Sequence, residues 1–187
     1  MQLPDSTRVR LHPGVRLAPR TDEPRVALGG HALKGDVLGS GKCTMVATVA
    51  KVGDRRTIFY GQLVLCFEML YLGRWQAVCY VRWLDTVRAV MSTVAGVEGR
   101  VPRGGQPRFN AAEQALLSEM EAAPFAAYRW SRATGATASG HPRAGDPHFG
   151  VVAMDAVLYA VPMIPIFRFT PDAAGPIFFL NSDMWDI

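Results

Sequence analysis

The chain has 187 residues and a net charge of +4, and 49% of its residues are hydrophobic. This composition can bury a core, which excludes a globally disordered chain. No run of eighteen or more apolar residues occurs, and the N-terminal residues lack the pattern of a secretory signal, so we expect no membrane partner. The length suits one domain with an insertion, or two very small domains.

The charge is unevenly distributed along the chain. Residues 147–187 contain one Arg against four Asp, a balance of −3, so the first 146 residues carry +7. Such a basic region is typical of proteins that bind nucleic acid or another acidic partner. Abundant Arg, Ala and Gly are also what GC-rich coding produces, and the composition leaves both interpretations open.

The cysteines favour a reducing compartment. Cys43, Cys66 and Cys79 all lie in apolar stretches, and none belongs to a C-x-x-C pair. An odd number of buried thiols indicates free core cysteines rather than a disulfide framework, and hence an intracellular protein. A thiol in the middle of an apolar strand behaves as an inert small hydrophobe, so we expect no cysteine nucleophile.

Residues 1–40 are predicted to form an irregular N-terminal arm. Pro and Gly recur throughout this segment together with five arginines, and nothing marks a helix. RVRL and GVRL each have the composition of a short edge strand. The domain proper is therefore expected to span residues 41–187.

Strands follow the arm. Residues 44–50 predict a first strand, and Gly53-Asp54 a hairpin turn. In the next run, residues 57–69, side chains alternate between two faces, and Gly61 suggests a bulge or a close backbone approach. After a turn at Leu72-Gly73, residues 74–84 alternate again, which is typical of a half-exposed antiparallel meander. Its outer face, a candidate recognition surface, carries Arg74, Gln76, Tyr80 and Arg82.

An insertion with a helix is predicted at about residues 88–148. Residues 87–109 are rich in Gly, Pro and Arg, which indicates a loop. Asn110, three residues before Glu113, predicts a helix with a capping box that ends at Pro124. A second loop leads to two strands between residues 150 and 169, with a turn near Asp155.

The order of these features resembles bromo-adjacent homology (BAH) domains. FYGQLVLCFE followed by WQAVCYVRWLDT is similar to the core hairpin of that family, and MDAVLYAVPMIP and FFLNSDMWD are similar to its late segments. The same motifs resemble the BAH-like C-terminal module of Kyakuja–Dileera–Zisupton-type transposases. The resemblance covers about 100 residues. It implies a mainly β fold, a partly open BAH-like barrel, and a transposon-derived chromatin module in the nucleus.

The resemblance also implies a candidate ligand site. Some BAH domains read methylated lysine with an aromatic cage, because the ring quadrupole attracts a quaternary ammonium. Phe59 matches the position of a cage tyrosine and Trp83 that of a cage tryptophan, while the acidic partner would be Asp85. Phe for Tyr and a displaced acid depart from the family pattern. The alternative is that Phe59 and Trp83 belong to the core.

No enzyme chemistry is predicted. His141, Asp146 and His148 are residue types that bind metal ions. They lie in a Pro/Gly loop without a nearby cysteine, so a solvated loop is the preferred interpretation. The GSGK sequence before Cys43 lacks the spacing of a phosphate-binding loop. Because no acid, base and nucleophile occur at useful spacing, we expect neither a cofactor nor catalysis.

Five arginines form the best candidate surface for phosphate. Loop arginines can follow a nucleic-acid backbone, and Tyr128 or Trp130 could stack on bases. The alternative is ordinary surface charge on a solvated insertion. The candidate residues are Arg100, Arg103, Arg108, Arg129 and Arg132.

Two functions follow from the sequence. The first is a non-enzymatic binding module for chromatin, nucleic acid or a protein partner. The alternative is a protein–protein scaffold subunit of a larger assembly, which uses apolar strand edges and the arm without touching nucleic acid or histones. Salt dependence distinguishes them, because phosphate binding weakens steeply with ionic strength and an apolar interface does not.

Overall fold

The fold is mainly β, with a curled, partly open sheet, as the sequence predicts. The computed structural model describes residues 9–12, 14–16, 32–34, 44–123, 126–134, 143–166 and 176–180. These residues belong to two compact units. The first comprises the described parts of Met1–Arg82 and Phe149–Val161, and the second those of Trp83–His148 and Pro162–Ile187.

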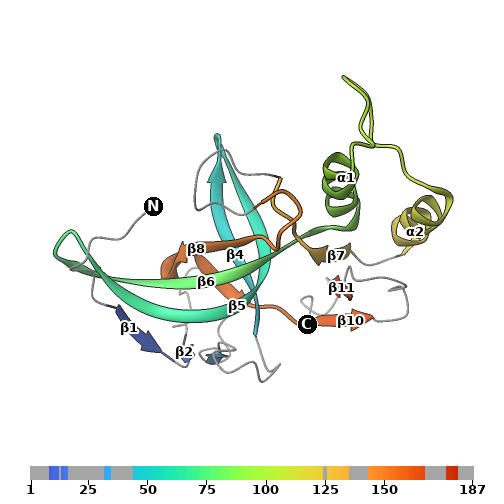
Figure 1. The fold of residues 1–187 in the computed structure, drawn as a ribbon. Helices are drawn as coiled ribbons and strands as arrows, with labels where there is room; N and C mark the ends of the chain where they lie inside the picture. The colour runs from blue at the N-terminus through green and yellow to red at the C-terminus, as the bar shows by residue number, and fades with distance from the viewer. Residues whose placement is uncertain are drawn as a thin grey trace. The chain divides into compact units, whose positions relative to one another are not determined.

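The first unit is an antiparallel sheet built around one long hairpin (Figure 1). β5 (Arg55–Tyr71) and β6 (Arg74–Thr86) form this hairpin. β4 (Met45–Val52) pairs with the first half of β5, and β1 (Val9–His12) with its second half. β8 (Phe149–Ala153) pairs with β6, and β9 (Val157–Ala160) with β4. A separate small sheet joins β2 (Gly14–Arg16) to β3 (Ala32–Lys34).

Both predicted hairpin turns are confirmed. Gly53, with a φ of 60°, and Asp54 separate the paired residues Val52 and Arg55. Glycine at the first of two loop positions is the arrangement of a type II′ turn. Leu72 and Gly73, with φ of 49° and 75°, both have the positive φ that a type I′ turn requires. Each loop has two residues, the length whose twist matches that of the flanking strands.

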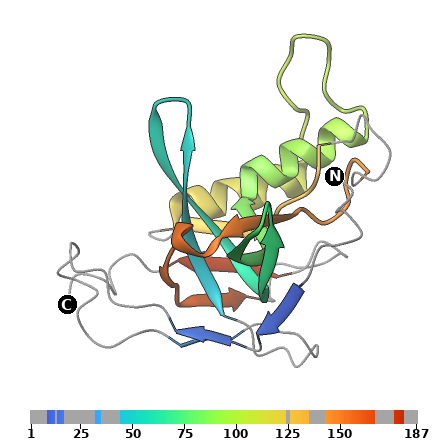
Figure 2. The same ribbon diagram turned by 90° about the vertical axis from the view of Figure 1, so that its left-hand side faces the viewer.

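The core of the first unit lies on both halves of the long hairpin. Leu63, Cys66, Cys79 and Val81 are completely buried. Leu63 and Cys66 are three positions apart, an odd difference that places them on opposite faces of a regular strand, so β5 does not keep one buried face along its length as simple alternation predicts. The reason is that β5 curls past two different neighbours, β4 and then β1 (Figure 2). Pairing with β4 continues through Gly61 without a bulge.

The second unit combines a small antiparallel sheet with two helices. The end of β6 pairs with β7 (Ala126–Trp130), β7 with β11 (Ile177–Leu180), and β11 with β10 (Met163–Ile166). α1 (Val87–Val97) and α2 (Ala111–Ala122) lie side by side (Figure 2). Its buried apolar cluster consists of Val87, Met91, Leu117, Met120, Ile177 and Phe179.

α1 corrects the prediction of a loop from residue 87. Valine, threonine and glycine are weak helix formers, and this composition suggested irregular structure. The helix forms because one face, including Val87 and Met91, is buried in the apolar cluster, and such packing outweighs propensity. The Thr86 hydroxyl also caps the helix by accepting a hydrogen bond from the Ala89 N–H at 3.3 Å.

The prediction for α2 is confirmed. Asn110 Oδ1 accepts a hydrogen bond from the Glu113 N–H at 2.9 Å, and Glu113 Oε2 accepts one from the Asn110 N–H at 2.8 Å. These two bonds are the reciprocal pair of a capping box. The turn expected near Asp155 is also present, as the short 3₁₀ segment η2 (Met154–Ala156).

No helix in the described part of the chain is both long enough and apolar enough to cross a membrane. The division into an arm at residues 1–40 and a domain at 41–187 stays a prediction.

Candidate interaction surface

The two faces of the β5–β6 hairpin are distinguished by its cysteines. Cys66 Sγ and Cys79 Sγ lie 3.9 Å apart, and both side chains are completely buried. They therefore share the inner face of the sheet. Because side chains alternate along a strand, Phe67 on β5 and Tyr80 on β6 lie on the opposite, outer face.

The strand registers extend this outer face over four strands. β1 places Val9 opposite Met69 and Leu11 opposite Phe67. Directly opposed residues in an antiparallel pair point to the same side. On the other side of the hairpin, β8 places Val151 opposite Tyr80 and Phe149 opposite Arg82 in the same way. We call this surface the outer face, formed by Val9, Leu11, Phe67, Met69, Arg74, Gln76, Val78, Tyr80, Arg82, Phe149 and Val151.

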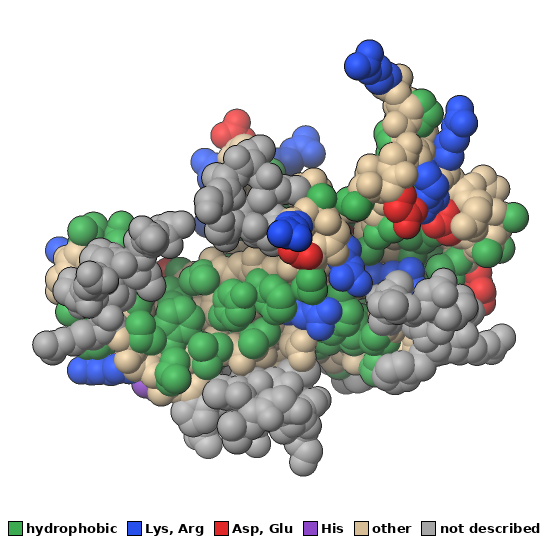
Figure 3. Space-filling view, in the orientation of Figure 1, with side chains coloured by type: hydrophobic (Ala, Val, Ile, Leu, Met, Phe, Trp, Pro, Cys, Tyr) green, Lys and Arg blue, Asp and Glu red, His purple; other side chains and the backbone are tan. Residues whose placement is uncertain are grey.

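The outer face exposes large apolar side chains. The exposed fractions are 46% for Val9, 62% for Leu11, 36% for Phe149 and 57% for Val151. An antiparallel sheet with one solvated face normally places polar residues there. Hydrophobic side chains instead gather over the strands of the first unit (Figure 3). Exposed apolar side chains on such a face make it a candidate interaction surface.

An aromatic pair anchors one end of the outer face. The rings of Tyr80 and Phe149 are stacked, with centroids 5.2 Å apart and an interplanar angle of 9°. The Arg82 guanidinium carbon lies 6.0 Å from the centroid of the Phe149 ring. Tyr80 and Arg82 were predicted on the recognition face, whereas β8 was missed as its partner. A strand was predicted from residue 150, but its sequence contains no signal for which strand it pairs with.

A polar cluster occupies the inner face near the hairpin tip. The Arg10 guanidinium carbon lies 3.9 Å from the centroid of the Trp75 ring. Glu68 Oε2 lies 3.8 Å from Arg10 Nη1 and 3.4 Å from His12 Nε2. Such exposed pairs contribute little to stability one by one, but together they hold β1 against the hairpin.

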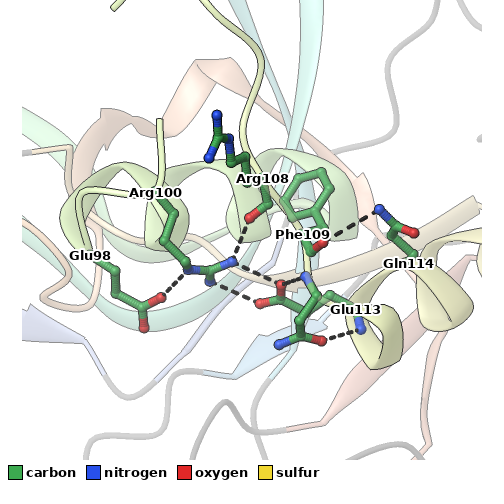
Figure 4. Close-up of polar contacts among 7 residues, drawn as sticks. Glu98, Arg100, Arg108, Phe109, Glu113 and Gln114 are labelled. Atoms are coloured by element: carbon green, nitrogen blue, oxygen red, sulfur yellow. Dashed lines mark hydrogen bonds and ion pairs between the residues drawn. The ribbon is translucent and has the colours of Figure 1, made fainter. Parts of the chain in front are cut away.

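In the second unit, Arg100 joins the loop before α2 to the helix itself (Figure 4). Its Nη1 and Nη2 each lie 2.9 Å from a carboxylate oxygen of Glu113, its Nε lies 2.6 Å from Glu98 Oε2, and Nη1 donates to the Arg108 carbonyl at 2.7 Å. The hydrogen bonds from Arg100 lower the pKa of Glu113, and those to Glu113 and Glu98 raise the pKa of Arg100. The guanidinium is committed to this network.

The arginine set predicted to face phosphate is therefore not one surface. Arg100 is held by two carboxylates, and the side chain of Arg129, on β7, is buried. Arg132 is half-buried and donates to the Gly145 carbonyl at 3.3 Å. The exposed side chains of the set are those of Arg103 and Arg108, both in the loop between the helices.

The candidate cage residues belong to different units. Phe59 lies on β5 in the first unit and is exposed, contrary to the interpretation that it belongs to the core. Trp83 is half-buried and Asp85 exposed in the second unit, where Asp85 Oδ1 accepts a hydrogen bond from the Thr86 N–H at 2.8 Å. An aromatic cage stays a prediction.

The loop residues considered as metal ligands have local partners. Asp146 Oδ2 accepts a hydrogen bond from the Arg143 N–H at 2.8 Å, and His148 Nδ1 lies 3.2 Å from Ser131 Oγ. His141 and Cys43 lie outside the described residues. Within the described ranges, no group of three or more His, Cys, Asp and Glu side chains is placed to hold a metal ion.

Comparisons with protein-family models, with curated proteins and with solved structures find no match. The BAH-like resemblance rests on its sequence motifs, and it too stays a prediction.

Proposed function

We propose that this chain is a non-enzymatic binding module that recognises a protein partner through the outer face of its first unit. The observation that carries the proposal is the exposure of Val9, Leu11, Phe149 and Val151 on one side of a four-stranded surface. Removal of exposed apolar surface from water is the main favourable contribution to the free energy when two proteins associate. This reading favours the scaffold alternative among the functions expected from the sequence.

The chemistry of the outer face suits a protein better than a nucleic acid. Phosphate binding needs several cations along one surface, and the outer face carries Arg74 and Arg82 among nine apolar or neutral residues. An arginine beside a stacked aromatic pair is instead typical of interface anchors between proteins. The Tyr80–Phe149 pair with Arg82 is such an anchor.

Each apolar anchor supplies a useful share of binding energy. Burying an exposed aliphatic or aromatic side chain completely contributes about 1.5–3 kcal/mol. Association must offset the loss of rotational and translational freedom, so several anchors have to act together. The four exposed side chains lie on β1 and β8, on either side of the β5–β6 hairpin and on the same face, so a partner that spans the hairpin can bury them together.

A second candidate function is nucleic-acid or chromatin binding through the second unit. It is favoured by the exposed side chains of Arg103 and Arg108 and by the +7 charge of the first 146 residues. The transposon-derived, nuclear setting is suggested by the sequence resemblance alone. This candidate requires the α1–α2 loop, and the protein-binding proposal requires the first unit, so one set of variants tests both.

Site-specific photo-crosslinking tests the proposal. A photoreactive phenylalanine analogue replaces Val151 in one sample and Val52 in the other, and each is irradiated in the cells that produce the protein. Val52 is the matched control, since it is 56% exposed against 57% for Val151 but lies at the β4–β5 turn. We expect a discrete cross-linked protein from position 151 alone. Equal products from both positions, or none, contradict the proposal.

A further inference from the structure

Three sulfur atoms meet on the inner face of the first unit. Cys66 Sγ lies 3.9 Å from Cys79 Sγ, and Cys79 Sγ lies 3.5 Å from Met154 Sδ. The two cysteines face each other across the β5–β6 hairpin, and Met154 begins the 3₁₀ segment directly after β8. Residues separated by as many as 88 positions in the chain are thus joined by the sheet.

The fold positions each sulfur for a structural reason. The two-residue turn at Leu72-Gly73 sets the register that opposes the cysteines. β8 pairs Val152 with Cys79 and Ala153 with Val78, so the chain turns into η2 beside the thiol of Cys79. The backbone pairing of Val152 and Ala153 therefore positions the thioether of Met154.

The three sulfur-bearing residues differ in burial. Both thiols are completely buried, and Val81 beside them is completely buried as well. Met154 is half-buried, so it is the least buried of the three ligand residues.

We propose that Cys66, Cys79 and Met154 form a binding site for a soft monovalent metal ion, Cu(I). Thiolate and thioether ligands select Cu(I) over harder cations. A metal ion bound at about 2.3 Å from three coplanar sulfurs holds those sulfurs about 4.0 Å apart. Two of the three sulfur–sulfur separations, Cys66–Cys79 at 3.9 Å and Cys79–Met154 at 3.5 Å, are close to this value.

Binding is an exchange of protons for the metal ion, without a change in oxidation state. Each thiol loses its proton to the solvent and forms one S–Cu bond, while the Met154 thioether donates a lone pair. The metal ion displaces both protons as the two S–Cu bonds form.

This inference is independent of the proposed function, because the sulfurs lie on the inner face and the partner surface on the outer face. Cys66 and Cys79 do not form a disulfide bond. Two sulfurs 3.9 Å apart are not bonded, since a disulfide bond is about 2.05 Å long and its formation would require an oxidant. The reduced pair is the state that the structure shows.

Anaerobic titration of the reduced full chain with Cu(I), supplied as its acetonitrile complex and measured in competition with bathocuproine disulfonate, tests the site. We expect one Cu(I) for each chain, and X-ray absorption with about three sulfurs at about 2.3 Å. Met154→Leu keeps the apolar volume but removes the sulfur, so it should weaken binding at least about tenfold. Cys66→Ser and Cys79→Ser should each abolish stoichiometric uptake.

Two variants are matched controls. Met91→Leu changes a buried methionine of the second unit, and Cys43→Ser removes the remaining cysteine of the chain. Both should bind Cu(I) as the parent chain does. No uptake by the parent chain, or parent-like affinity in Met154→Leu, would overturn the proposal. Circular dichroism identifies a serine variant that fails to fold, and Met154→Leu, at a half-buried position, then decides the outcome.

Discussion

The Phe149 ring stacks on the Tyr80 ring across two paired strands, with centroids 5.2 Å apart. In the β6–β8 ladder Tyr80 is opposite Val151 and Phe149 is opposite Arg82, so the two rings are diagonal neighbours on the outer face. The pair ties β8, which comes late in the chain, to the central hairpin. The stacked pair therefore connects the β8 part of the proposed partner surface to the part formed by the hairpin.

The stacked pair should be measurable as a coupling energy. Offset aromatic pairs contribute about 0.5–1.5 kcal/mol beyond the area that they bury. A double-mutant cycle with Tyr80→Leu and Phe149→Leu, followed by urea unfolding, should give a coupling of this size. Tyr80→Leu combined with Leu11→Ala is the control, because β5 separates β1 from β6, and its effects should add. Strict additivity in the first cycle would show that the stacking has no energetic role.

The β5–β6 turn contains an unfavourable residue. Leu72 has a φ of 49° and is 85% exposed, so its side chain gains little from packing while its backbone is in the left-handed region. Leu72→Asn should raise the free energy of unfolding by about 0.5–1 kcal/mol, since asparagine tolerates this conformation. Gly73→Ala, at a φ of 75°, should lower it by a similar amount. A destabilised Leu72→Asn protein would refute the type I′ assignment.

The Arg100 network predicts a pH dependence of stability. The folded-state pKa of Glu113 is lowered, so its stabilising contribution is fully present above the ordinary carboxyl pKa of 4.5. It is lost as the pH falls through the lowered folded-state value. Glu113→Gln should reduce the loss of stability below pH 4.5 in acid unfolding curves. Glu119→Gln, an exposed change on the same helix, should leave the curve unchanged, and identical curves for both variants would contradict this account.

Binding of arginine variants to duplex DNA tests the nucleic-acid alternative. If the partner is a protein, replacing Arg103 and Arg108 by Ala should alter binding to duplex DNA no more than replacing Arg55 and Arg56, an exposed arginine pair at the β4–β5 turn. Fluorescence anisotropy over a salt series measures both. A selective loss for the loop variant, with a shallower salt slope, would favour nucleic-acid binding instead.

Local chemistry made the turns and α2 predictable from sequence. Gly53, Gly73 and the Asn110–Glu113 pair act within a few residues of themselves, so their conformations follow from residue type. α1 was missed because its stability comes from packing rather than propensity. The mainly β class was also predictable, because residues 57–71 and 74–84 are two long runs rich in β-branched and aromatic residues on either side of a two-residue turn.

Less of the candidate site than of the fold could be predicted from the sequence. Strand alternation placed Tyr80 and Arg82 on one face, but only the ladder with β8 reveals Phe149 and Val151 beside them. The same holds for the charged residues. A count of arginines cannot show that Arg100 is paired with Glu113 or that Arg129 is buried, because both facts depend on contacts distant in sequence. The sulfur cluster likewise needs the sheet to bring Met154 to Cys79.

The affinity of the cross-linked partner for outer-face variants tests the central claim most directly. With purified components, calorimetry should show binding at least about tenfold weaker for Val151→Glu, because a charge would be buried in an apolar interface. Val52→Glu, equally exposed in the parent chain, should bind as tightly as the parent, and the parent affinity should change little with salt. Equal loss in both variants, or unchanged binding by Val151→Glu, would contradict the assignment of the outer face as the partner surface.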